Sequence, residues 1–340
     1  MGLVRILFLA DTHLGFDFPF QPRIQRRRRG YDFFNNYEIT LKAALEAKVD
    51  CVVHGGDIFF RSKVPARLVE MVFEPLKRVA DKGLPVYLVP GNHERSTIPH
   101  GHLATHPLIH VFNRPRTFTL QKDGCVLALA GFAFQRIGIR KDLLSLLHET
   151  GWRRTKADAF VLCIHQSVDG ATVGPANYRF LYAHDVVKTT DIPSEFAAVL
   201  AGHIHRFQVL TKDLRGKPLA TPVFYPGAIE RTSFAEKNEK KGYLILEFET
   251  RKSAAGHLKR WQFHPLYARP MIQLELYATL MHPKELGAWL KNSLEQLPPD
   301  SVVKLKIHGE VTADVMNVLR APSLRSLAPG TMNIAAVFPQ

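Results

Sequence analysis

Short apolar runs alternate with amphipathic segments along the first 90 residues. The runs at 4–10, 50–54 and 84–89 have the length and apolar character of buried strands. Between them, segments 33–47 and 64–80 repeat apolar side chains at helical spacing; in the first, Leu41, Ala44 and Leu45 share one face. A strand–helix alternation of this kind predicts an α/β fold.

The middle of the chain is richer in strands. Residues 118–134 read as two strands around the turn at Lys122-Asp123-Gly124, and residues 143–149 read as a helix. Further strands are expected at 160–164, at 197–201 and, as three separate runs, between 207 and 248. This pattern predicts two packed sheets with helices outside them.

A boundary is expected near residues 265–270. The segment that follows has a compact β-α-β pattern, then a further helix and a final strand at 333–338. The expected strands and helix of the β-α-β pattern lie at 271–278, 283–296 and 301–308. We therefore expect a large domain over residues 1–265 and a small α+β domain over residues 270–340 docked beside it.

Composition narrows the class of protein. No run approaches the roughly 18 to 20 apolar residues that a membrane span needs, and the apolar start leads into Asp11 without a signal-peptide cleavage site. The three cysteines lie in apolar runs and lack C-x-x-C spacing, so we expect buried free thiols and neither disulfides nor a Cys zinc site. A location in the cytoplasm, free or with the nucleoid, is expected.

The net charge of +14 favours a polyanionic partner, either nucleic acid or a membrane surface. A generally basic surface would account for the charge equally well. The conspicuous cluster is Arg26, Arg27, Arg28 and Arg29. This run is read either as a solvated loop or as a phosphate contact, and the motifs described next favour the contact.

Five short motifs lie where an apolar strand ends and a loop begins. They are Asp11-Thr12-His13, Gly56-Asp57, Gly91-Asn92-His93-Glu94, His165 and Gly202-His203-Ile204-His205. Ligands commonly bind at the carboxyl ends of strands in α/β sheets. Carboxylates, histidines and an amide are the donors that a pair of metal ions needs to neutralise a phosphodiester and activate water. Each motif alone is weak, but together they predict a two-metal hydrolytic site.

These motifs resemble the calcineurin-like metallophosphoesterase superfamily, whose pattern is D-x-H, G-D, G-N-H-[DE], H and G-H-x-H. The resemblance covers about residues 1–265 and implies a four-layer α/β/β/α sandwich. It implies that the first metal binds Asp11, His13, Asp57 and His205, and the second Asp57, Asn92, His165 and His203. His93 would act on the leaving oxygen, and Glu94 would lie behind the ligands and orient a histidine.

Local details resemble the SbcD-type DNA repair nucleases. The segments that resemble this family are Asp11-Thr12-His13-Leu14-Gly15, Gly56-Asp57-Ile58-Phe59, Pro90-Gly91-Asn92-His93-Glu94, Tyr225-Pro226-Gly227-Ala228-Ile229-Glu230-Arg231 and Lys241-Gly242-Tyr243. This resemblance implies manganese-dependent 3′→5′ exonuclease action on duplex DNA and endonuclease action on single strands, with a metal-bridging hydroxide. It also implies a homodimer, an SbcC-type ATPase partner, and a capping role for the small domain in holding DNA.

Two features depart from that family. Phe60 stands where the family often has a histidine, and Arg61 follows it; we expect Phe60 to stack on a base and Arg61 to contact a phosphate. The sequence given also ends at Gln340, where the ATPase-binding helices of the family would follow. The chain is then either part of a longer protein or independent of that partner.

Other readings stay open at this stage. The same fold serves phosphatases and cyclic-nucleotide phosphodiesterases, and some relatives are non-catalytic scaffolds. A second histidine cluster is read as loop and helix surface because it lacks a carboxylate or cysteine; its members are His100, His102, His106 and His110. Leu103, Leu108 and Ile109 are candidate dimer contacts. His54, inside a strand, is expected to be structural.

Overall fold

The computed structural model describes all residues except 1, 18–27, 95–105, 252–253, 280 and 339–340. The chain divides into two compact units. The larger unit comprises Met1–Phe16, Phe33–Arg231 and Glu239–Leu266, and the smaller comprises Asp17–Asp32, Thr232–Asn238 and Tyr267–Gln340. The smaller unit thus draws two short segments from the first 240 residues as well as the C-terminal segment.

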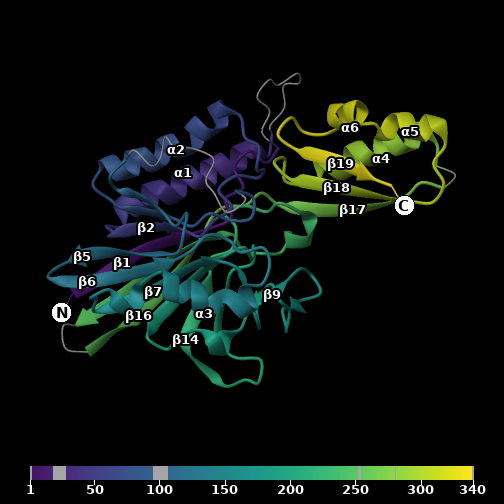
Figure 1. Ribbon diagram of the computed structural model, residues 1–340. Helices are drawn as coiled ribbons and strands as arrows, with labels where there is room; N and C mark the ends of the chain where they lie inside the picture. The colour runs from purple at the N-terminus through teal and green to yellow at the C-terminus, as the bar shows by residue number, and fades with distance from the viewer. Residues whose placement is uncertain (1, 18–27, 95–105, 252–253, 280, 339–340) are drawn as a thin grey trace. The chain divides into compact units, whose positions relative to one another are not determined.

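The first sheet of the larger unit has six strands in the order β16-β15-β1-β2-β3-β4. Figure 1 labels β1, β2 and β16 of this sheet. Its four parallel strands are β1 (Gly2–Leu9), β2 (Cys51–His54), β3 (Val86–Leu88) and β4 (Ile109–Val111). The antiparallel edge is β15 (Gly242–Arg251) and β16 (Ala254–Pro265). Strand β16 was not predicted, because it is an edge strand whose sequence mixes charged and aromatic residues without strict alternation.

The second sheet also has six strands, in the order β13-β14-β12-β7-β6-β5. The parallel strands are β6 (Cys125–Gly131), β7 (Ala159–His165), β12 (Phe196–Gly202) and β14 (Pro218–Tyr225). The antiparallel edge strands are β5 (Arg116–Lys122) and β13 (Gln208–Lys212). The β5–β6 turn has left-handed backbone at Asp123 and Gly124, as a two-residue hairpin requires.

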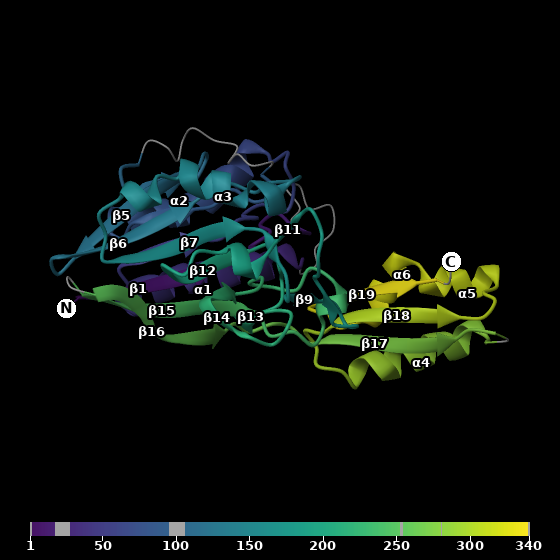
Figure 2. The same cartoon turned by 60° about the horizontal axis from the view of Figure 1, so that its bottom comes forward.

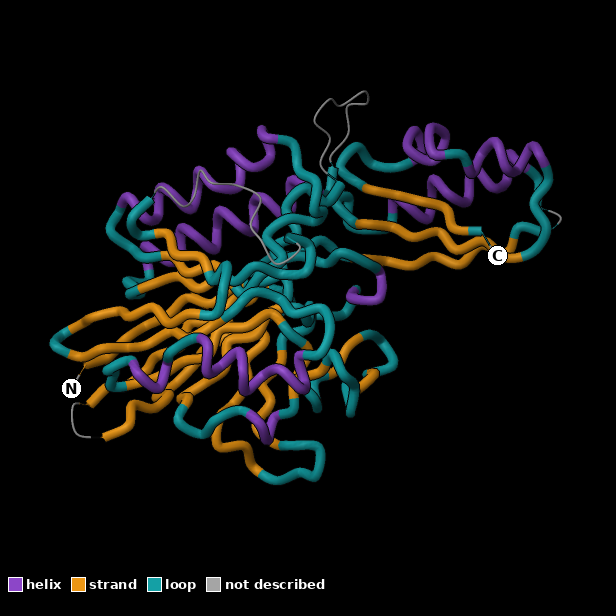
Figure 3. The backbone as a smooth tube through the Cα atoms, in the orientation of Figure 1, coloured by secondary structure: helices purple, strands orange, loops and turns teal. Residues whose placement is uncertain are grey.

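Helices cover the outer faces of both sheets, and Figure 3 shows them flanking the strands. Apolar side chains of α1 (Gly30–Glu46) and α2 (Ala66–Asp81) share a core with the first sheet, and α3 (Ile139–Glu149) shares one with the second. A third core lies between the sheets. The predicted four-layer sandwich is confirmed. Leu41 and Ala44 are buried as expected, but Leu45 is 41% exposed.

Shorter elements connect these layers. Four two-residue strands pair as β8 with β11 and as β9 with β10; they are β8 (Ser167–Val168), β9 (Thr172–Val173), β10 (Tyr178–Arg179) and β11 (Val186–Val187). Single 3₁₀ turns lie at Trp152–Arg154, Thr189–Asp191 and Phe234–Glu236. The three cysteines are buried and free, as predicted. Within the described ranges, no helix combines the length and apolarity that a bilayer crossing requires.

The smaller unit is built on a parallel sheet in the order β17-β18-β19, with α4, α5 and α6 beside it (Figure 2). Its strands are β17 (Met271–Tyr277), β18 (Val302–His308) and β19 (Asn333–Val337), and its helices are α4 (Pro283–Glu295), α5 (Ala313–Leu319) and α6 (Ala321–Leu327). Two helices stand where one was predicted, because Arg320 is extended and α6 restarts with a proline in its first turn. Buried Arg269 bonds Asp32 at 3.1 Å and Asn333 at 2.7 Å, all three within the smaller unit.

Candidate metal centre

The five motifs lie at the carboxyl ends of strands from both sheets of the larger unit. Asp11 follows β1, Asp57 follows β2 and Asn92 follows β3, whereas His165 ends β7 and His203 follows β12. Main-chain hydrogen bonds hold the first two loops side by side: the amides of residues 11, 13 and 14 donate to the carbonyls of residues 56, 57 and 58 at 2.8–3.0 Å. The structure therefore brings residues from distant parts of the chain to one edge of the sandwich.

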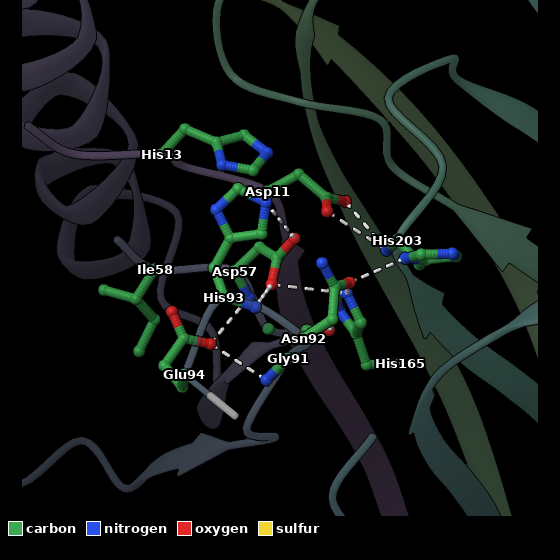
Figure 4. Close-up of polar contacts among 12 residues, drawn as sticks. Asp11, His13, Asp57, Ile58, Gly91, Asn92, His93, Glu94, His165 and His203 are labelled. Carbon is green, nitrogen blue, oxygen red and sulfur yellow. Dashed lines mark hydrogen bonds and ion pairs between the residues drawn. The ribbon is translucent and has the colours of Figure 1, made fainter. Parts of the chain in front are cut away.

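Donor atoms of the predicted ligands converge at this edge (Figure 4). One set within 4.8 Å contains Asp11, His13 and His205, and another contains Asp11, Asp57 and His165. The Nε2 atoms of His13 and His205 are 2.8 Å apart. The Oδ1 atom of Asn92 lies 3.0 Å from Nε2 of His165 and 2.9 Å from Nδ1 of His203. All seven residues predicted as metal ligands thus belong to one connected cluster.

Main-chain contacts orient two of the histidines. The Nδ1 of His165 donates to the carbonyl of Gly55 at 2.7 Å, which turns its Nε2 toward Asn92 and Asp57. The amide of His203 donates to both carboxylate oxygens of Asp11 at 3.1 Å. The first bond fixes the imidazole of His165, and the other two fix the main chain of His203 beside Asp11.

His93 occupies a different position in the cluster. Its side chain is 30% exposed, whereas that of His165 is fully buried. Its Nδ1 donates to the carbonyl of Phe60 at 2.6 Å, and its Nε2 lies 3.8 Å from Asp57. His93 also falls within 4.8 Å of His13 and Asp57, so distance alone does not separate it from the ligands. Partial exposure does not separate it either, since His203 and His205 are also partly exposed, but it leaves the imidazole within reach of a substrate.

Glu94 ties the loops together from behind. Its carboxylate accepts hydrogen bonds from the main-chain amides of Asp57 and Phe59 at 3.0 Å and of Gly91 at 2.8 Å. Burial, and next the charge of Asp57, raise the pKa of Glu94 to about 7. All three donors are main-chain amides, so Glu94 holds the backbone of the Asp57 loop in place.

Burial and neighbouring charges distribute the protons. Burial opposes ionisation of Asp57, but the charge and hydrogen bond of His165 lower the pKa of Asp57 well below its ordinary value. Burial would lower the pKa of His165, yet Asp57 raises it to about 9. Burial raises the pKa of Asp11 to about 6, and burial followed by the charge of His165 lowers the pKa of His203 to about 3. The charge of Asp57 is therefore compensated by the proton on His165. A metal cation bound at this place would compete with that proton.

The backbone of the cluster is strained. Asp11, His13, Asp57 and His203 adopt φ values of 51°, 44°, 52° and 88°, in the left-handed region that non-glycine residues rarely enter. Gly91 meets a different requirement, because a Cβ there would lie 2.3 Å from Oδ1 of Asp57. The sequence motifs indicate the residue types but not this conformation.

Sequence reasoning missed one positioning group. The carbonyl of His205 accepts from the amide of Ala228 at 3.0 Å and from Nζ of Lys241 at 2.7 Å. Lys241 is 1% exposed, and its ammonium also bonds Glu239 at 3.0 Å. Lys241 and Ala228 lie in the two segments that were noted only for their resemblance to nucleases. Both segments hold the main chain of His205.

The predicted DNA-contact residues fall into two groups. Phe60 packs edge-on against Phe16 with ring centroids 4.9 Å apart, and the exposed Arg61 lies 5.8 Å over the Phe60 ring. Arg28 and Arg29 belong to the smaller unit, where the guanidinium of Arg28 pairs with Asp17 at 2.5 Å. Arg26 and Arg27 lie outside the described residues.

The second histidine cluster differs from its prediction. His110 lies in strand β4 and stacks on Tyr87 with centroids 5.0 Å apart, so reading this residue as loop or helix surface was wrong. His106 bonds Asp81 at 3.1 Å. Neither histidine belongs to a metal-capable group of the described residues. His100, His102 and Leu103 lie outside those residues; Leu108 is partly buried and Ile109 is buried beside the first core.

His54 is buried within β2 and has a structural contact on each nitrogen. Its Nε2 lies 3.0 Å from the hydroxyl of Thr12, and its Nδ1 accepts from the amide of Gly56 at 3.1 Å. Burial, and next the charge of His165, lower the pKa of His54 to about 3, so the ring is neutral. It therefore braces the two loops that carry Asp11 and Asp57.

The donor set fits divalent metal ions. Carboxylate, imidazole and amide oxygen donors together suit manganese, iron or zinc. Asp57 is within reach of Asp11 and His165 on one side and of His13 on the other, as a bridging carboxylate must be. The ionised Asp57 and the neutral His203 are in the protonation states that metal ligation needs.

Comparison with known proteins identifies the family. The profile of the calcineurin-like phosphoesterases matches residues 4–207. The DNA double-strand break repair protein Mre11 of Aeropyrum pernix is 26% identical over 255 residues, which cover 72% of this chain and 58% of that protein. Mre11 of Archaeoglobus fulgidus is 25% identical over 341 residues, covering 95% of this chain and 72% of that protein.

The SbcD component of the SbcCD nuclease of Bacillus subtilis is also similar, at 25% identity over 369 residues that cover 98% of this chain and 86% of that protein. The chain nevertheless spans little more than half the length of some relatives, 58% of the Aeropyrum protein and 52% of Mre11 from Saccharolobus solfataricus. The predicted resemblance is confirmed at the level of the superfamily and of its Mre11 and SbcD members. The chain belongs to the calcineurin-like phosphoesterase family, with Mre11 and SbcD proteins among its relatives.

Proposed function

We propose that the chain is a two-metal-dependent DNA nuclease, a 3′→5′ exonuclease on duplex DNA or a single-strand endonuclease, that acts in DNA repair. The supporting observation is the convergence of donor atoms from five strand ends at one edge of the larger unit. The names of the relatives, which describe DNA double-strand break repair proteins and a nuclease, support DNA as the substrate. The net charge of +14 fits a phosphate backbone.

In this proposal the chain would hold two divalent cations, of which manganese is our first choice. Asp11, His13, Asp57 and His205 would hold one, and Asp57, Asn92, His165 and His203 the other. The cations would supply neutralisation of the phosphodiester charge and activation of water. Asp57 bridges the two ligand sets, and Glu94 keeps its loop in place through the amides of Asp57 and Gly91.

His93 would act on the scissile phosphodiester itself. Because Nδ1 donates to the carbonyl of Phe60, the ring is fixed with Nε2 toward Asp57 and the cluster. A proton on that Nε2 would stabilise the departing oxygen and then move to it. His93 is thus proposed as a catalytic residue, and the seven other side chains as metal ligands.

The same proposal extends to the binding partners of the chain and to its location in the cell. The part of the smaller unit over residues 270–340 would be a capping domain that assists DNA binding, and Arg28, Arg29 and Arg61 would contact phosphates. We propose an SbcC-type ATPase partner, because the Bacillus relative is named as one component of SbcCD. A homodimer in the cytoplasm, close to the nucleoid, completes the proposal.

The deciding experiment uses a duplex labelled at one 5′ end and a labelled single strand, each incubated with the protein and Mn²⁺. A shortening ladder on the duplex, absent in His93→Ala and Asp57→Ala, is expected. Mn²⁺ binding should persist in His93→Ala and weaken in Asp57→Ala. Hydrolysis of a small phosphodiester without cleavage of either DNA would overturn the nuclease assignment in favour of a phosphatase or cyclic-nucleotide phosphodiesterase.

A further inference from the structure

The small sheet has one covered face and one open face. Along β18, Val303, Leu305 and Ile307 are buried in a core with leucines of α4, α5 and α6. The intervening residues Lys304 and Lys306 therefore project from the opposite face. The apolar faces of α4, α5 and α6 all contribute to the covered side, so none of these three helices lies on the opposite face, which we call the open face.

One end of the open face presents a flat aromatic surface. Tyr277 and His308 are register partners on β17 and β18, and their rings stack with centroids 4.8 Å apart and an angle of 17°. Tyr277 is nevertheless 73% exposed. An imidazole behind the ring fixes its plane while its other face stays in solvent. A large aromatic ring held in this way on a sheet surface indicates a binding site for another planar group that stacks on it.

The other end of the face contains a second aromatic ring beside a hollow. The ammonium of Lys304 lies 5.9 Å over the ring of Phe234. Phe234, Lys304, Val302 and Ala335 line a hollow of about 380 Å³, whose wall is mainly apolar. This volume is in the range of small-ligand pockets.

Two lysines of β18 lie between the two aromatic ends. Lys304, Lys306 and His308 alternate along β18, so neighbouring members are about 6.6 Å apart along the strand. Glu275 is the register partner of Lys306 and contacts both Lys306 and His308. The row is therefore net positive despite one carboxylate.

The rim of the hollow carries further charge. Arg29 belongs to its lining, as does Asp17. The guanidinium of Arg28 pairs with Asp17 and offsets the negative charge of its carboxylate. The end of the arginine run therefore adds to the positive charge of the open face.

We propose that the open face of the β17–β18–β19 sheet binds single-stranded DNA. One base stacks on Tyr277, a second enters the hollow beside Phe234, and Lys304 and Lys306 contact the phosphates between them. Aromatic platforms joined by a basic track are how sheet surfaces bind single strands. A duplex is excluded from this mode because its bases are already stacked and paired. This inference rests on the proposed DNA nuclease and specifies which strand its small unit holds.

The test measures binding of a fluorescent oligothymidylate and of a duplex of equal length to the full chain, with EDTA present to prevent cleavage. Tyr277→Ala should weaken single-strand binding by about 5-fold to 100-fold, the range for loss of one stacked base. Tyr267→Ala, another exposed tyrosine of the same unit (66%), is the matched control and should change it less than about twofold.

The lysines are tested by salt dependence. The double substitution Lys304→Gln with Lys306→Gln should reduce the slope of log affinity against log salt by about 1.4, at roughly 0.7 per single-strand phosphate contact. Lys284→Gln with Lys291→Gln, both on α4, is the control and should leave the slope as it is. Thermal melting of each variant establishes that it folds.

Two results would overturn the inference. One is a folded Tyr277→Ala protein that binds the single strand as tightly as the unaltered chain. The other is an equal loss of duplex and single-strand affinity in that variant, since stacking requires unpaired bases. Failure of the proposed function would be recognised separately, as an unaltered chain that cleaves no DNA with Mn²⁺.

Discussion

The metal centre of the larger unit and the open sheet face of the smaller unit are both polar, but they are built differently. At the metal centre Asp11, His13, Asp57 and His165 are buried, and main-chain groups from other segments hold several of the side chains. On the open face Tyr277 and Lys306 are exposed, and the described contacts of this face are with neighbours across one pair of strands and with Phe234. Buried polar groups need the whole fold around them, whereas surface groups need only local register. Substitutions should therefore have large effects at the first and graded effects at the second.

The largest expected effect comes from Gly91→Ala. A Cβ at residue 91 would lie 2.3 Å from Oδ1 of Asp57 and 2.4 Å from the main-chain nitrogen of Asp57. Asp57 must therefore move. A displacement of about 1 Å in a catalytic site can cost about 100-fold in rate. We expect at least that loss in Mn²⁺-dependent hydrolysis of a small phosphodiester, with a free energy of unfolding lower by about 1–3 kcal/mol.

Gly287→Ala is the control for this glycine. A Cβ at residue 287 in α4 meets no atom within 4 Å. Helix propensity predicts a gain in unfolding free energy of up to about 1 kcal/mol, with the rate of hydrolysis retained. Wild-type hydrolysis by Gly91→Ala would show that the Asp57 loop is not held as tightly as the structure indicates.

A smaller loss is expected from Lys241→Met. The substitution removes the ammonium that bonds the carbonyl of His205 and leaves a side chain of similar length in its buried site. Groups behind metal ligands typically contribute about 10-fold to 100-fold in metal affinity. Calorimetric titration with Mn²⁺ should show a loss in this range. The exposed neighbour Lys240→Met should stay within about twofold, and equal affinities of the two variants would remove Lys241 from the positioning role.

Arg61→Ala should have a graded effect, because Arg61 is exposed although it follows a ligand loop. We expect kcat/KM for DNA to fall about threefold to fivefold relative to that for a small phosphodiester, as for one exposed charge pair. Arg67→Ala, an exposed arginine of α2, provides the comparison. A DNA-to-diester ratio in Arg61→Ala that matches wild type would exclude a phosphate contact by this guanidinium.

Glu275→Gln should produce the smallest change, and in the opposite direction. The substitution removes the carboxylate beside Lys306 and His308 and should tighten oligothymidylate binding by about twofold to fivefold. Glu285→Gln, on the first turn of α4, is the matched control. Weaker binding by Glu275→Gln would mean that the carboxylate of Glu275 holds His308 and Tyr277 in position. Its effect on the net charge of the open face would then be secondary.

The sequence was most informative where local pattern and chemistry coincide. Each predicted ligand ends or follows an apolar run that the structure shows as a strand, so the strand ends could be located before the fold was known. Lys241 could not be recognised in this way, because its bond to His205 joins residues 36 apart in sequence. The pairing of Asp32 with Arg269 spans 237 residues, and so the membership of segment 17–32 in the smaller unit also depends on tertiary contacts.

The left-handed backbone of Asp11, His13, Asp57 and His203 has an evolutionary consequence. Glycine would occupy such φ values with less strain, a difference of roughly 1–2 kcal/mol per residue. A relative released from catalytic selection should therefore drift toward glycine at these positions and become more stable as it does so. Persistence of aspartate and histidine here is a mark of selection for chemistry, because folding alone would favour their loss.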